Sequence, residues 1–104
     1  MRIRKELMTN EDYQLIARAS DALAHPARVA IFRFIYSKNL KREMVCNKDL
    51  VAELDYSQST ISQHIAKLIH GGLIQVQQEG PKNYYYVNLG ELGKYINSVK
   101  KLNL

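Results

Sequence analysis

The sequence predicts a mainly α-helical domain with a β-hairpin, in the order α-α-α-α-β-β-α. Four stretches of apolar residues at helical spacing come first, and each begins at a residue that favours a helix start. Two short runs of strand-forming residues then flank a group of turn residues, and a last amphipathic stretch follows. Because the 104 residues contain no internal repeat and no linker, we expect residues 1–104 to form a single domain.

The first two helices are expected before residue 37. Thr9 is a capping residue at the start of residues 9–24, where apolar side chains recur at helical spacing. Pro26 suits the first position of the second helix, which is apolar on more than one side and which we expect to be the most buried. The polar and basic stretch from Ser37 to Arg42 predicts a connection, which either faces solvent or lies near a phosphate backbone.

Two helices joined by a tight turn follow. Asn47 can cap a short helix with an apolar face, and Asp55 interrupts the pattern soon afterwards. Ser57 can then cap a longer helix that runs to Gly71. This spacing is typical of a helix-turn-helix, in which the second helix enters the major groove of DNA.

A β-hairpin and a final helix complete the domain. Residues 73–77 and 84–87 are rich in strand formers, and residues 79–83 between them are dense in turn residues. Asn88 can cap a helix over residues 89–102, whose apolar stripe is formed by Leu89, Leu92, Ile96 and Val99. A helix-turn-helix followed by a hairpin, or wing, predicts a winged helix-turn-helix domain.

The charge of the chain makes double-stranded DNA a leading partner. The formal net charge is +5, and a surplus of lysine and arginine raises the affinity for polyanions. The competing interpretation is a basic protein that is simply well solvated. No apolar run approaches the roughly 20 residues that cross a bilayer, so we expect no membrane partner and a cytoplasmic location. Cys46 is the single cysteine, which fits a reducing compartment.

The helix predicted from Ser57 to His70 has two different sides at about 100° per residue. Its aliphatic residues share one side, and its polar residues lie opposite them or in the first turn. Hydroxyl, amide and amine groups can hydrogen-bond to base edges and phosphates. We therefore expect a DNA-binding surface formed by Ser57, Gln58, Ser59, Thr60, Ser62, Gln63 and Lys67. An ordinary amphipathic surface helix is the competing interpretation.

The hairpin adds two candidate DNA contacts near its turn. Lys82 can reach a backbone phosphate or the minor groove, and Asn83 follows it. A turn that serves folding alone is the competing interpretation for Lys82, and it is the favoured one for Pro81.

Four segments resemble the ArsR (arsenic-repressor) family of winged-helix repressors. They are ALAHPARVAI at residues 22–31, YSQSTISQHI at 56–65, GLI at 72–74 and YYYV at 84–87. The resemblance implies a homodimer built from the first and last helices, residues 9–24 and 89–102. It also implies a near-palindromic operator and repression of transcription until an inducer arrives, but it does not identify the inducer. In a symmetric dimer the two recognition helices lie about one DNA turn apart.

The metal sites of the resembling family are incomplete in this sequence. One site needs two cysteines separated by one residue just before Asp-Leu, and here Lys48 stands in place of the second cysteine. Another site needs histidines on the last helices, and no histidine follows Gly72. We therefore expect no metal site and no cofactor, and we interpret as structural the isolated histidines His25, His64 and His70.

Catalysis is not expected. The sequence holds no glycine-rich phosphate loop, no nucleophile–base pair at a recognisable spacing and no acid pair in a plausible cleft. Cys46 precedes a helix start near Lys48, so it is either a redox-sensitive thiol or a buried, inert cysteine. The alternative to a sequence-specific transcriptional regulator is a winged-helix module that binds proteins and not DNA.

Overall fold

The computed structural model describes residues 7–103 and confirms the predicted order of elements. The helices are α1 (Asn10–Ala22), α2 (Pro26–Leu40), α3 (Asn47–Glu53), α4 (Gln58–His70) and α5 (Leu89–Lys100), with a 3-10 turn at Lys101–Asn103. Strands β1 (Ile74–Glu79) and β2 (Lys82–Val87) form an antiparallel hairpin. Within residues 7–103, none of the helices is long and apolar enough to cross a membrane.

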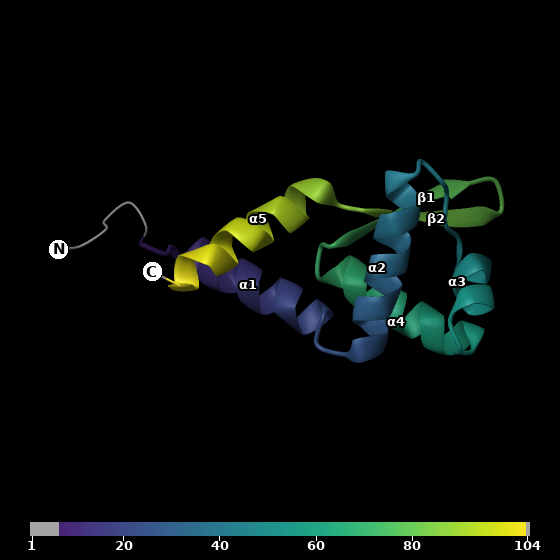
Figure 1. Ribbon diagram of the computed structural model, residues 1–104, viewed down its shortest axis with the longest axis horizontal. Coiled ribbons are helices and arrows are strands. Elements are labelled where there is room, and N and C mark those ends of the chain that lie inside the picture. Colours follow the sequence, from purple (N-terminus) through teal and green to yellow (C-terminus); the bar gives the residue numbers. More distant parts are fainter. Residues whose placement is uncertain (1–6, 104) are drawn as a thin grey trace.

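The molecule has two parts, which we call the body and the arm. The body consists of α2, α3, α4 and the hairpin, whereas the arm consists of α1 and α5, which lie side by side and project away from the body (Figure 1). The hydrophobic core of the body joins all of its elements, and its fully buried side chains include Ile31, Ile35, Val45, Leu50, Ile61, Leu68, Leu73 and Ile74. Burial of each such aliphatic side chain contributes roughly 1.5–3 kcal/mol to the free energy of unfolding.

The start and end of α4 follow from its sequence. Oγ of Ser57 accepts a hydrogen bond from the backbone N–H of Thr60 (3.3 Å), which caps the helix. Gly72 follows the helix with a φ of +84°, a conformation that side chains disfavour. A side-chain carbon at Gly71 would overlap Cβ of Ala22 in α1. The absence of a side chain at Gly71 therefore lets the arm pass directly against the end of α4.

The second helix differs from its prediction in two ways. Residues 37–40 continue α2 instead of forming a connection, because tertiary contacts hold this extra turn. Oδ1 of Asn39 accepts a hydrogen bond from the N–H of Val87 in the hairpin (2.9 Å). The expectation that this helix is the most buried is wrong, since three of its 15 residues are buried and three of the 13 residues of α4 are buried as well.

The boundaries of α3 and of the hairpin also differ. Cys46, and not Asn47, is the residue that precedes α3, because the carboxylate of Asp49 accepts a hydrogen bond from the Cys46 N–H (2.9 Å). Both strands are longer than predicted, so Lys82 and Asn83 belong to β2 and not to the turn. The remaining turn is Gly80-Pro81, where the φ of +62° at the glycine permits a tight reversal.

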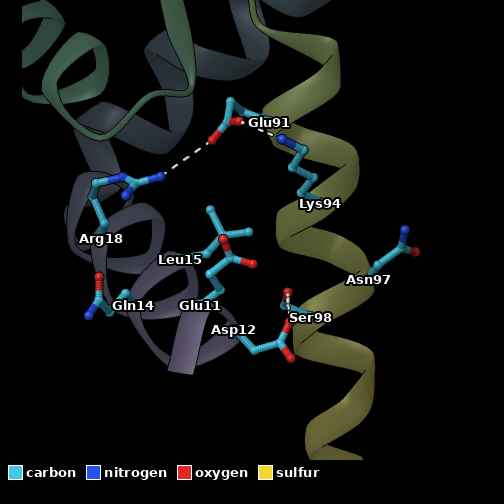
Figure 2. Close-up of a pocket in the computed structure, with 9 residues that line it drawn as sticks. All are labelled: Glu11, Asp12, Gln14, Leu15, Arg18, Glu91, Lys94, Asn97 and Ser98. Carbon is cyan, nitrogen blue, oxygen red and sulfur yellow. Dashed lines mark hydrogen bonds and ion pairs between the residues drawn. The ribbon is translucent and has the colours of Figure 1, made fainter. Parts of the chain in front are cut away.

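A buried carboxylate joins the two helices of the arm. Oδ1 of Asp12 accepts a hydrogen bond from the hydroxyl of Ser98 in α5 (2.6 Å), and Oδ2 accepts from Nζ of Lys101 (3.0 Å) and from the N–H of Thr9 (2.8 Å). Figure 2 shows Asp12 and Ser98 facing each other between the helices. The hydrogen bond from Ser98, with those from Thr9 and Lys101, holds the pKa of this carboxyl well below its usual range.

Two histidines and an arginine connect α4 with the start of α2. Nδ1 of His25 accepts a hydrogen bond from the N–H of Ala27 and so caps α2 (3.0 Å). The ring of His64, in α4, lies 4.7 Å from the His25 ring between their centroids. Arg28 donates to the backbone carbonyl of Ala22 at the end of α1 (2.8 Å), so it ties α2 to the arm. Partial burial, together with the nearby His25 and Arg28, lowers the pKa of His64 below 6.5.

The lowered pKa of His64 predicts a loss of stability in mild acid. The unfolded chain takes up a proton on His64 near pH 6.5, whereas the folded protein takes it up only at a lower pH. The contribution of neutral His64 to the free energy of unfolding is therefore fully present above pH 6.5, and it is lost as the pH falls from 6.5 towards the pKa of the folded protein. We expect the free energy of unfolding, measured by urea titration, to fall less between pH 7.5 and 5.5 in His64→Gln than in the unchanged protein. Equal losses in the two proteins would contradict this role for His64.

Candidate nucleic-acid interface

The polar side of α4 is turned away from the core, as the sequence predicts. Ile61, Ile65 and Leu68 are buried against the body. The opposite side carries six of the seven residues predicted on this helix and its cap, all of them exposed: Ser57, Gln58, Ser59, Ser62, Gln63 and Lys67. The aliphatic side thus fixes the helix on the body and leaves its hydrogen-bonding groups accessible.

Two of the predicted residues are engaged in capping. Oγ of Ser57 accepts from the N–H of Thr60 and also donates to Oγ1 of Thr60 (3.0 Å). Thr60 is half-buried. The side chains of Ser57 and Thr60 are therefore committed to the start of the helix, whereas the side chains of Gln63 and Lys67, further along α4, form no hydrogen bond within residues 7–103.

A cleft between α3, α4 and the wing brings four of the predicted residues together. It has a volume of about 360 Å³ and is lined by Gln58 and Ser62 of α4 and by Lys82 and Asn83 of β2. Ser59, Gln63 and Lys67 lie outside the cleft on the same helix. The wing and the polar side of α4 therefore form one continuous polar surface.

Five further residues line this cleft, although the sequence did not place them there. They are Cys46, Asn47 and Lys48 at the start of α3, Pro81 in the turn of the wing and Tyr85 of β2. The side-chain amide of Asn47 donates from Nδ2 to Oγ of Ser62 (3.0 Å), which joins α3 to α4. In the sequence, Lys48 stands out as the residue that replaces a metal-binding cysteine and as a neighbour of Cys46, whereas its place beside the wing depends on long-range packing.

Cys46 lines the same cleft and is half-buried. Its backbone forms an isolated β-bridge with Tyr84, and the carbonyl of Val45 accepts from the N–H of Tyr85 (2.8 Å). These contacts attach the start of α3 to the second strand of the wing. A redox role for the thiol stays a prediction.

No metal-binding cluster is found within the part of the chain that the structure describes. Among residues 7–103, no group of three or more histidine, cysteine, aspartate or glutamate residues could hold a metal ion. His25 and His64 are close, but Nδ1 of His25 accepts the Ala27 N–H, so the free Nε2 of the neutral ring carries the proton. Metal binding at that nitrogen would therefore break the cap of α2.

The arm presents an apolar face and a polar face. Tyr13 of α1 is 59% exposed, and α5 exposes Leu89 (60%), Ile96 (44%) and Val99 (36%). Ser20 of α1 and Tyr95 of α5 are joined by a hydrogen bond between their hydroxyls (2.9 Å). By helical spacing, each of the two lies on the same flank of its helix as the exposed apolar residues. The other flanks enclose a polar groove, where Glu91 pairs with Arg18 (3.3 Å) and Lys94 (3.5 Å) (Figure 2).

Two transcriptional regulators are similar to this chain in sequence over more than half of its length. An uncharacterised HTH-type transcriptional regulator of Methanocaldococcus jannaschii is 27% identical over 92 residues, which cover 88% of this chain and 99% of that protein. The arsenical resistance operon repressor of Staphylococcus aureus is 29% identical over 59 residues, 57% of each chain.

A solved structure supports the fold. The homodimeric winged helix-turn-helix DNA-binding domain of a Mycobacterium bovis protein superimposes with a TM-score of 0.68 at 17% identity, over 92% of this chain and 86% of that one. The model of the bacterial regulatory protein family arsR matches residues 25–76, from the start of α2 into β1. This chain therefore belongs to the ArsR family of winged helix-turn-helix transcriptional regulators, which are not enzymes.

Proposed function

We propose that this protein is a sequence-specific DNA-binding repressor that acts in the cytoplasm as a homodimer on a near-palindromic operator. The observation that carries the proposal is the division of α4 into a buried aliphatic side and an exposed polar side that continues into the wing cleft. In a helix-turn-helix the second helix contacts base edges in the major groove. Glutamine, serine and lysine supply the hydrogen bonds that distinguish base pairs there.

The shape of the arm supports a homodimer. Two helices alone cannot enclose a core, and the arm leaves Tyr13, Ile96 and Val99 exposed on one flank. A second copy placed by a two-fold axis would cover the same flank on both protomers. The Mycobacterium bovis neighbour is described as homodimeric, which agrees with this arrangement. A two-fold protein requires two half-sites in inverted orientation, which is the reason for a near-palindromic operator.

Repression, as opposed to activation, is supported by the Staphylococcus aureus relative, which is named as an operon repressor. A repressor of this size needs only to occupy its operator. The protein-interaction module is the alternative function, and the free hydrogen-bonding groups of α4 favour DNA over that alternative.

Sequence discrimination is expected to depend on Gln63. A duplex selected from a random pool and its single-base variants would be compared by mobility shift at physiological salt. Replacing Gln63 by Ala removes one hydrogen-bonding side chain from the middle of α4, so we expect roughly a tenfold loss of discrimination at one base pair per half-site. The matched control is Gln14→Ala, on the polar flank of the arm, which should bind as the unchanged protein does.

Salt dependence separates DNA binding from protein docking. Affinity for the duplex should fall steeply as salt rises, because lysines release counterions from the phosphates. A flat response would favour the docking module, whereas unchanged discrimination in Gln63→Ala would contradict the role of Gln63 in reading the sequence.

The oligomeric state is expected to depend on the apolar flank of α5. Replacing Ile96 by Asp would place a charge in the proposed interface, at a cost of about 3 kcal/mol or more per buried charge, so the dimer should dissociate in sedimentation. Asn97→Asp adds the same charge to the next residue, which lines the polar groove, and should leave a dimer. A monomeric unchanged protein, or equal effects of the two variants, would count against this interface.

A further inference from the structure

The wing cleft holds two lysines that have no carboxylate partner among the described residues. Lys48 lies in α3, Lys82 is the first residue of β2, and both line the same cleft. Within residues 7–103, the ion pairs join other residues and neither of these two amines takes part. Asp49 lies next to Lys48, but its carboxylate accepts the Cys46 N–H and faces a different hollow.

We propose that this cleft binds one backbone phosphate of the duplex between Lys48 and Lys82. The inference rests on the proposed function and gives a distinct role to part of the surface. Lys48 and Lys82 bring two positive charges to one cleft, and an anion bound in it would be attracted by both. The phosphodiester is the group that every DNA duplex brings with that charge. The volume of about 360 Å³ leaves room for a sugar–phosphate unit.

Ser62 is a third ligand of the same phosphate, because Asn47 orients its hydroxyl. Nδ2 of Asn47 donates to Oγ of Ser62 (3.0 Å), so the serine hydroxyl accepts from α3 and keeps its own hydrogen free. Oδ1 of Asn47 is buried without a hydrogen-bond partner in the described part of the chain. A phosphate oxygen can only accept hydrogen bonds, and a hydroxyl held in this way donates one. Asn47 is therefore a positioning residue for Ser62.

This arrangement divides the polar surface into two kinds of contact. Lys48, Lys82 and Ser62 hold the backbone in the cleft, and they set the register of the duplex without distinguishing its sequence. Gln63 and Lys67, outside the cleft on α4, are left to contact base edges. A residue on α3, outside the recognition helix and the wing, thus takes part in DNA binding.

The test combines charge removal on the protein with charge removal on the DNA. Duplexes that carry a single methylphosphonate, a neutral replacement for one phosphate, would be prepared for each position of the selected site. Lys48→Gln and Lys82→Gln are each expected to weaken binding of the natural duplex roughly tenfold, as loss of one charge-assisted hydrogen bond does. On the duplex that is neutral at the shared phosphate, both variants should bind as tightly as the unchanged protein.

Two further variants complete the test. Ser62→Ala is expected to weaken all duplexes alike except the one that is neutral at the shared phosphate, with no change in base preference. Lys94→Gln removes the same charge from the arm and should bind within about twofold of the unchanged protein on every duplex, since distant charges are screened at physiological salt. Circular dichroism melting would verify that each variant is folded.

Three outcomes would overturn the inference. If Lys48→Gln binds the natural duplex as tightly as Lys94→Gln does, Lys48 holds no phosphate. If the losses from Lys48→Gln and Lys82→Gln disappear on different methylphosphonate duplexes, the two lysines do not share one. In both cases a loss of discrimination in Gln63→Ala would leave the proposed function intact. If the unchanged protein binds no duplex at all, the proposed function fails together with the inference.

Discussion

The structure depends on the way α4 divides its side chains between the core and the solvent. Ile61, Ile65 and Leu68 bind the helix to the body through hydrophobic burial, which has no direction of its own. Direction comes from the helical spacing, because residues three and four apart share a side. Most polar residues between them therefore face solvent, and Thr60 and His64 are half-buried. Ser57 fixes where this spacing starts by capping the first turn. A rotation of the helix by one residue would bury polar groups. The packing of α4 against the core therefore also fixes which of its polar groups face the DNA.

The arm and the body are coupled at the far end of the same helix. Gly71 allows α1 to pass against the end of α4, and Arg28 ties the start of α2 to the carbonyl of Ala22. The Asp12 network then fixes α5 against α1. Rigid contacts therefore run from the apolar flank of the arm to the recognition helix. In the proposed dimer, this connection would set the separation and angle of the two recognition helices on the DNA.

The sequence predicts those features that depend on neighbouring residues. Thr9, Ser57 and Asn88 each accept a hydrogen bond from a backbone N–H three residues later, so the starts of α1, α4 and α5 are visible locally. The end of α2 is not, because Asn39 binds Val87, 48 residues away. The hairpin extends past its predicted ends because Lys82 and Asn83 pair with Glu79 and Gln78 across the turn, although neither type favours strands strongly.

The candidate site was likewise predicted where it depends on neighbouring residues and missed where it depends on long-range packing. The polar side of α4 follows from periodicity alone, and Lys82 follows from its place beside the turn. Asn47 and Lys48 were missed as cleft residues, because only the folded chain brings the start of α3 against the wing, through the bridge between Cys46 and Tyr84. The apolar stripe of α5 was visible in the sequence, whereas the polar groove on the other flank arises from α1 and α5 together.

In the proposed complex the polar side of α4 contacts the duplex. The most direct measurement is the change in backbone amide NMR shifts of the isotope-labelled protein when an operator-containing duplex is added. The largest changes are expected at residues 58–67 and at Lys82 and Asn83, with small changes at Glu11 and Gln14 on the polar flank of the arm. Large changes confined to the arm, with α4 unaffected, would contradict it.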